Sequence, residues 1–293
     1  MIVITTPTGK IGSQLVRNLL AAGESLRLIA REPARIAPEI REKTEVVQGS
    51  SDDESVLMRA LHGAESLFLV VPPSFTTNDD REYFLQFTRP VCSAVLRQGV
   101  KRVVTVSGVG RRVAVKAGPV TATFAKDAEI EKTGVDFRAL WCPGFMENML
   151  PAIPSLKQHG VFSFSGRSDV KSPLVATRDI ASSAARLLLD RTWTGQGGLA
   201  VLGPEDLSFD DMAATMTDVL GRLIRFKPLS GEEYKTQLMK FGASEHFAQS
   251  LLEMRAAKDN GLDLSEPRTP ENTTPTNFRQ WCTEVLKPAF VNA

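Results

Sequence analysis

The chain has 293 residues, enough for one large α/β domain or for a larger and a smaller domain, and we favour the second arrangement. Its 35 Lys and Arg residues nearly balance its 34 Asp and Glu residues, and the net charge of +1 argues against a nucleic-acid partner. No apolar run approaches the roughly 20 residues that cross a bilayer, so we expect no membrane insertion. Three widely separated cysteines and a start without a signal-peptide pattern favour a cytoplasmic protein.

Apolar, β-branched runs alternate with helical patterns through the first half of the chain. This alternation is typical of a parallel sheet that is covered on both faces. Between the first two runs, apolar residues at helix spacing predict a helix that packs on the sheet and ends near Gly23. The sequence therefore predicts an α/β fold of Rossmann type with a doubly wound parallel sheet. The strands predicted in this half are 2–5, 26–30, 45–48, 66–71, 102–107 and 137–141.

The second half changes character after Pro143 and Gly144, because prolines and glycines interrupt its periodicity. We therefore predict a first domain over residues 1–145 and a smaller C-terminal α/β lobe over 146–293. Residues 174–189 have the pattern of a strand leading into a helix, so we allow the chain to cross back into the sheet near 170–190. The remaining predicted elements are strands 199–202 and 224–228, helices 209–220, 232–261 and 278–286, and a loop at 266–276.

A tight glycine turn connects the first strand to the first helix. Gly9 lets the backbone approach a pyrophosphate, Gly12 lets the helix pack closely on the strand, and the helix N-terminus supplies free N–H groups. Thr6 stands where the usual fingerprint has its first glycine, and an ordinary βα turn is the alternative interpretation. The turn predicts a dinucleotide site in the first domain, contacted by Thr6, Thr8, Gly9, Lys10, Ile11 and Gly12.

The end of the second strand indicates which dinucleotide is bound. An NAD enzyme has an acidic residue here, whereas this chain has Arg31, about twenty residues beyond the turn and suited to pair with a 2′-phosphate. The alternative is a solvated arginine that Glu32 neutralises, or a Glu32 that itself faces the ribose. We predict NADP(H) as the cofactor, with Ser50 near the adenine and Arg35 as a secondary phosphate contact.

Motifs along nearly the whole chain resemble those of the NmrA-like branch of the atypical short-chain dehydrogenases. The resemblance implies a Rossmann domain that binds NADP(H), a smaller lobe above it, and a ligand cleft between them. Some members of this branch are NADPH-dependent reductases, and others bind the dinucleotide as redox sensors or regulators. The motifs are the turn 6–12, Val46-Val47-Gln48-Gly49, residues 103–108, Lys126 with Glu129 and Lys132-Thr133-Gly134-Val135, residues 142–148, and Gly203-Pro204-Glu205-Asp206-Leu207-Ser208.

Two residues are candidates for catalysis under this resemblance. A short-chain dehydrogenase carries a Tyr four residues before its Lys, but Ala122 stands at that position here, and phenol acid catalysis is not evident. Lys126 is expected to hydrogen-bond the nicotinamide ribose and to face developing negative charge, and the alternative is a helix lysine paired with Glu129. Ser107, at the carboxyl end of its strand, is expected to face the nicotinamide or the substrate, and the alternative is a serine that only caps the strand end.

Apolar residues at the same edge predict a small-molecule pocket. Val71, Pro72 and Phe145 are assigned to the cofactor, although ordinary core packing is the alternative for each. Phe75, Met146, Asn148 and Met149 are assigned to the substrate, with Asn148 orienting a carbonyl or capping a turn.

No His or Cys spacing indicates a metal. We expect the protein to transfer hydride from NADPH to a quinone, enone, azo or iminium acceptor. The alternative is a non-catalytic NADP(H) sensor. The sequence predicts no oligomeric state.

Overall fold

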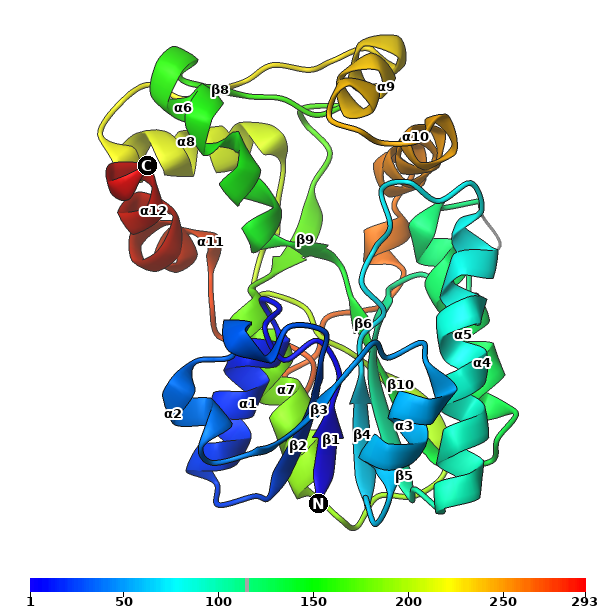
Figure 1. Ribbon diagram of the computed structural model, residues 1–293. Coiled ribbons are helices and arrows are strands. Elements are labelled where there is room, and N and C mark those ends of the chain that lie inside the picture. Colours follow the sequence, from blue (N-terminus) through cyan, green and yellow to red (C-terminus); the bar gives the residue numbers. More distant parts are fainter. Residues whose placement is uncertain (114–115) are drawn as a thin grey trace.

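The first domain is built on a seven-stranded sheet in which every pair of neighbouring strands is parallel. Figure 1 shows it in the computed structural model, which describes residues 1–113 and 116–293. The strand order is β10-β6-β5-β4-β1-β2-β3, and the predicted doubly wound α/β fold is confirmed. Its strands are β1 (Ile2–Ile4), β2 (Leu26–Ala30), β3 (Glu45–Gln48), β4 (Ser66–Leu69), β5 (Arg102–Gly108), β6 (Asp136–Cys142) and β10 (Gln196–Ala200).

Helices cover both faces of this sheet, as the apolar strands require. On one face α1 (Gly12–Ala21) and α7 (Thr177–Leu189) bury Leu15, Leu19 and Ile180 against Ile4 and Leu28. The other face carries α3 (Glu54–Leu61), α4 (Asp80–Gln98) and α5 (Pro119–Glu131) (Figure 1). Two short elements, η1 (Pro33–Arg35) and α2 (Pro38–Arg41), connect β2 to β3. None of the helices in the described ranges is long and apolar enough to cross a membrane.

A smaller lobe lies beyond the carboxyl ends of the strands (Figure 1). It contains a three-stranded sheet in the order β11-β9-β7 and a pair formed by β8 and β12. Its strands are β7 (Gly144–Phe145), β8 (Val161–Phe162), β9 (Ser172–Val175), β11 (Asp206–Leu207) and β12 (Arg225–Phe226). Its helices are η2 (Met146–Ala152), α6 (Ile153–His159), α8 (Phe209–Leu220), α9 (Gly231–Lys240), α10 (Glu245–Asp259), η3 (Leu262–Leu264), α11 (Phe278–Trp281), the π-helical η4 (Cys282–Leu286) and α12 (Lys287–Asn292).

The chain enters the lobe, returns to the first domain and then enters the lobe again. After β9 it forms α7, which packs beside α1, and β10, which extends the main sheet next to β6. The lobe is therefore assembled from two separate stretches of chain on either side of this crossing. The division at residue 145 stays a prediction.

The long helix predicted over 232–261 is two helices, α9 and α10. Gly242 between them has a φ of +90°, which a helix does not allow. Ser244 then caps α10, because its hydroxyl accepts the backbone N–H of Phe247 at 3.1 Å. This break lets α10 turn back towards the first domain, where it forms part of the site described next.

Candidate functional site

The glycine turn between β1 and α1 leaves no room for side chains at its critical position. A Cβ atom on Gly12 would lie 2.2 Å from the carbonyl oxygen of Thr6 and 3.2 Å from the Cα of Pro7. Thr6 has a φ of +49°, a left-handed conformation that is rare for a β-branched residue. No side chain caps the N-terminus of α1 at Ile11, so this helix end is open to an anion.

A cavity of about 830 Å³ surrounds this turn, and we call it the turn cavity. It runs from the end of β2 across the turn to the loop after β4 and the start of the lobe. The geometry brings together most of the residues that were predicted to contact the cofactor. Those that line the cavity are Thr6, Thr8, Gly9, Lys10, Ile11, Gly12, Arg31, Ser50, Pro72 and Phe145.

Arg31 is exposed at the end of β2 and lines the turn cavity. Within the described ranges its guanidinium forms no ion pair, and Glu32 instead lies 4.0 Å from the guanidinium of Arg35. The structure therefore contradicts the alternative in which Glu32 neutralises Arg31. Arg31 and Arg35 both remain at the cavity wall as candidate phosphate contacts, and Ser50 lines the same cavity.

A second cavity, of about 370 Å³, lies between the lobe and the first domain, and we call it the apolar cavity. Its walls come from the loop after β4, from β7 and η2, from β9 and α8, and from one face of α10. The predicted substrate residues Phe75, Asn148 and Met149 line it. The two cavities adjoin, because four residues line both: Pro73, Phe75, Phe145 and Asn148.

Aromatic rings form much of the apolar cavity. Phe75 packs against Phe247 of α10 with ring centroids 5.1 Å apart. Phe164 stacks on Phe209 at 5.6 Å with an angle of 12° between the rings, and the guanidinium of Arg255 lies 5.2 Å from the Phe209 ring centroid. Rings in this arrangement favour a flat, apolar ligand.

The cations in the apolar cavity are each held by a carboxylate. Arg255 pairs with Asp259 at 2.5 Å, and Lys258 pairs with Asp263 at 2.5 Å. Each ammonium or guanidinium charge is therefore balanced inside the protein, and the wall as a whole presents little net charge.

The loop after β4, which both cavities share, is fastened to α10. The backbone N–H of Ser244 donates to the carbonyl of Phe75 at 2.8 Å. Asp80, which is 7% exposed, accepts the hydroxyl of Ser250 and lies 3.4 Å from the imidazole of His246. These contacts hold the lobe against the edge of the sheet.

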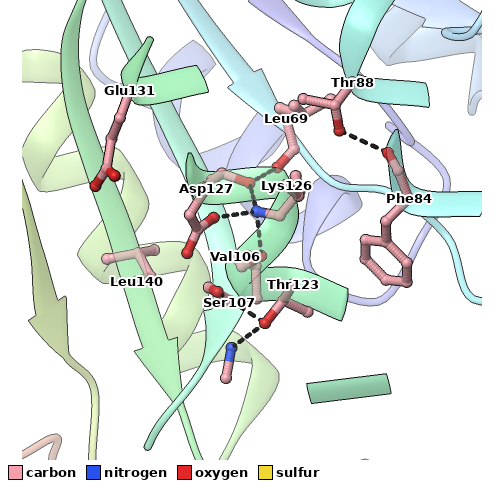
Figure 2. Close-up of polar contacts among 12 residues, drawn as sticks. Leu69, Phe84, Thr88, Val106, Ser107, Thr123, Lys126, Asp127, Glu131 and Leu140 are labelled. Atoms are coloured by element: carbon pink, nitrogen blue, oxygen red, sulfur yellow. Dashed lines mark hydrogen bonds and ion pairs between the residues drawn. The ribbon is translucent and has the colours of Figure 1, made fainter. Parts of the chain in front are cut away.

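The predicted catalytic residues Lys126 and Ser107 line neither cavity. Figure 2 shows the polar contacts that they make instead. The ammonium of Lys126, which is 1% exposed, donates to the Thr105 hydroxyl at 2.6 Å and lies 2.8 Å from Asp127. Burial lowers the pKa of Lys126, and Asp127 opposes that shift. Ser107 donates to the hydroxyl of Thr123 at 2.9 Å. These groups hold α5 on β5, and their catalytic roles stay predictions.

One alternative and two predictions are corrected by the position of the side chain. Lys126 does not pair with Glu129, because Glu129 lies 2.6 Å from Lys132 instead. Val71 points into the core while Val70 and Pro72 line the turn cavity, as alternation in extended backbone requires.

The third correction concerns Met146. It is 1% exposed and packs in the core of the lobe rather than lining either cavity. Phe145, which ends β7, and Asn148 of η2 take the cavity positions instead.

Comparison with known proteins decides the family. The model of the NmrA-like family matches residues 1–282. The chain belongs to the NmrA-like family.

Several relatives of this NmrA-like chain are reductases. The (4-alkanoyl-5-oxo-2,5-dihydrofuran-3-yl)methyl phosphate reductase of Streptomyces griseus is 30% identical over 292 residues, covering 97% of both chains. The NAD(P)H azoreductase of Xenophilus azovorans is 25% identical and covers 87% of this chain and 86% of its own. The solved NADPH-dependent quinone oxidoreductase of Escherichia coli, complexed with NADPH, has a TM-score of 0.80 at 24% identity, covering 98% of this chain and 99% of its own. This last likeness shows that the fold is shared.

Two further sets of residues of this NmrA-like chain lie at the site, although no sequence motif predicts them. One is Glu147, whose carboxylate accepts the backbone N–H of Thr177 at 3.0 Å and the indole N–H of Trp281 at 3.1 Å. Its carbonyl accepts the ammonium of Lys10 at 3.2 Å, so Glu147 ties the lobe to the glycine turn. The position of Glu147 at the site could not be identified from the sequence, because two of its partners lie more than a hundred residues away and the third lies on α7.

The other set is one face of α10, together with Tyr234 of α9. The α10 residues recur at helix spacing, a pattern that was present in the sequence but that reads equally well as core. Only the tertiary structure shows that this face meets the loop after β4. The lining residues of α10 are Phe247, Leu251, Met254, Arg255 and Lys258.

Proposed function

We propose that the protein is an NADPH-dependent oxidoreductase that reduces a small conjugated molecule. The observation that carries this proposal is the pair of adjoining cavities, with Pro73, Phe75, Phe145 and Asn148 in both walls. A dinucleotide in the turn cavity and an acceptor in the apolar cavity meet at these residues. The relatives named as an NAD(P)H azoreductase and as a (4-alkanoyl-5-oxo-2,5-dihydrofuran-3-yl)methyl phosphate reductase support the general activity.

The residues present fit NADPH. A Cβ on Gly12 would lie 2.2 Å from the Thr6 carbonyl oxygen, so glycine is required for the tight backbone cradle of this turn. The uncapped N-terminus of α1 points N–H groups and a partial positive charge at the turn cavity. Arg31, without an ion pair among the described residues, is placed for the 2′-phosphate that distinguishes NADPH from NADH. Bound NADPH supplies the hydride.

The chain's own residues position the acceptor and keep water away from it. The stacked rings of Phe164 and Phe209 hold a flat molecule, and the balanced charges of Arg255 and Lys258 favour an uncharged one. Lys126 is engaged in a buried ion pair, and Ala122 replaces the usual Tyr. We therefore propose acceptors that take hydride with little help from an acid: quinones, enones, azo compounds or iminium ions.

The test is the loss of NADPH absorbance with a panel of one quinone, one enone, one azo dye and one iminium compound. We expect acceptor-dependent oxidation with at least one member, and a much slower reaction with NADH at equal concentration. Oxidation with no member of the panel, in a protein that binds NADPH, contradicts the proposed activity.

A non-catalytic NADP(H) sensor is the second candidate. It is favoured by the position of Lys126, which lies away from both cavities, and by the absence of a Tyr at position 122. The sensor hypothesis predicts a rise in melting temperature with NADPH, as ligand excess gives, and no oxidation with any acceptor. The same panel therefore separates the two candidates.

A further inference from the structure

Tyr234 is a polar residue in a mainly apolar wall. It belongs to α9, is half-buried, and lines the apolar cavity together with Phe209 and Arg255. Within the described ranges its hydroxyl makes no hydrogen bond to protein, whereas the only other tyrosine, Tyr83, donates to the carbonyl of Pro72 at 3.0 Å. A half-buried phenol without a protein partner is satisfied by water or by a ligand.

The charged groups nearby do not use this hydroxyl. Arg255, on the adjacent helix α10, is held by Asp259 through two nitrogens, one of them at 3.0 Å, and Lys258 is held by Asp263. Burial raises the pKa of the Tyr234 phenol, and Arg255 partly offsets that shift, so the phenol keeps its proton at neutral pH. Tyr234 is therefore an available hydrogen-bond donor in the wall.

We infer that Tyr234 is a specificity-determining residue that donates a hydrogen bond to a carbonyl or another neutral polar group of the bound acceptor. The inference rests on the proposed function, because it places the acceptor in the apolar cavity. Asn148 lies where the two cavities meet, so Asn148 serves the reacting end of the molecule and Tyr234 serves a second polar group. The site then selects flat, uncharged molecules that carry two separated polar groups, and a quinone has this form.

The test removes one hydroxyl and measures binding rather than turnover. Tyr234→Phe keeps the ring in the wall and deletes the donor. Thr236→Val is the matched control, because it deletes a hydroxyl from an exposed position of the same helix, outside the apolar cavity. Calorimetric titrations of the NADP⁺ complexes use 1,4-naphthoquinone as the probe and naphthalene, which has the same fused-ring skeleton without carbonyl groups, as the control probe.

We expect Tyr234→Phe to weaken naphthoquinone binding about three- to tenfold, the usual effect of one neutral hydrogen bond, and to leave naphthalene binding within about twofold. Thr236→Val should change neither. Equal naphthoquinone affinities in wild type and Tyr234→Phe overturn the inference, as does an equal loss for both probes, which indicates lost packing. If naphthoquinone binds as expected but NADPH is never oxidised, the proposed reductase activity fails while the role of Tyr234 stands.

Discussion

Replacing Gly12 with alanine tests the geometry of the glycine turn most severely. The new methyl would lie 2.2 Å from the carbonyl oxygen of Thr6, so that oxygen has to retreat by nearly an ångström. The same oxygen accepts the backbone N–H of Gly9 at 3.0 Å, and this bond is lost when it moves. Overpacking costs about 1–3 kcal/mol and a broken hydrogen bond about 1 kcal/mol, so we expect a loss of about 3 kcal/mol in unfolding free energy.

The assay combines urea unfolding with NADPH titration. Gly12→Ala should weaken NADPH binding at least tenfold, because the displaced Thr6 carbonyl belongs to the backbone that forms the cradle. Gly197→Ala in β10 is the control, since a Cβ there meets nothing within 4 Å, and we expect a change of less than about 0.5 kcal/mol. A Gly12→Ala protein as stable as Gly197→Ala, with NADPH affinity intact, refutes the account of the turn.

Three further substitutions test other parts of the structure. Arg31→Asp should weaken NADPH binding about 10–100-fold and leave NADH binding nearly unchanged, and equal losses for both, measured by calorimetry, count against a 2′-phosphate contact. Asp80→Asn leaves the Ser250 hydroxyl without its charged acceptor, so amide hydrogen exchange should rise along α10, and unchanged exchange would show that this contact does not hold the lobe. Hydrogen bonds from the backbone N–H and the hydroxyl of Ser208 lower the pKa of Asp211. The ionised Asp211 therefore stabilises the folded protein fully above its ordinary pKa of 3.8, and this stabilisation is lost as the pH falls through the lowered folded-state pKa. Asp211→Asn should therefore melt at a lower temperature than wild type at pH 7, and the difference should narrow as the pH falls below 3.8; a difference that does not depend on pH contradicts this.

Much of the first domain could be predicted because its signals are local. Buried parallel strands read as short apolar runs, and the glycine turn is contained in seven consecutive residues, Thr6 to Gly12. The 209–220 helix was predicted with its observed bounds, because Ser208 caps one end and Gly221 ends the other with a φ of +67°.

The features that the sequence could not predict depend on the direction of a side chain or on residues far away along the chain. Val71 and Val70 are adjacent and equally apolar, yet only Val70 faces the turn cavity, because one residue of offset reverses the side chain in extended backbone. The alternative of a solvated Lys126 paired with Glu129 is not found, because α5 turns this side chain towards β5 and its buried ion pair, and its role at the cofactor stays a prediction. Tyr234 of α9 shares the wall of the apolar cavity with α10, because the helix breaks at Gly242 and α10 folds back beside α9.

The central claim is that a dinucleotide and an acceptor occupy adjoining cavities and meet at the residues common to both. A crystal structure of the protein with NADP⁺ tests this most directly. The account predicts the pyrophosphate at the N-terminus of α1, the 2′-phosphate beside Arg31, and the nicotinamide ring against Phe145 and Asn148, facing the apolar cavity. A nicotinamide that lies away from these two residues, or an NADP⁺ bound elsewhere on the protein, would contradict it.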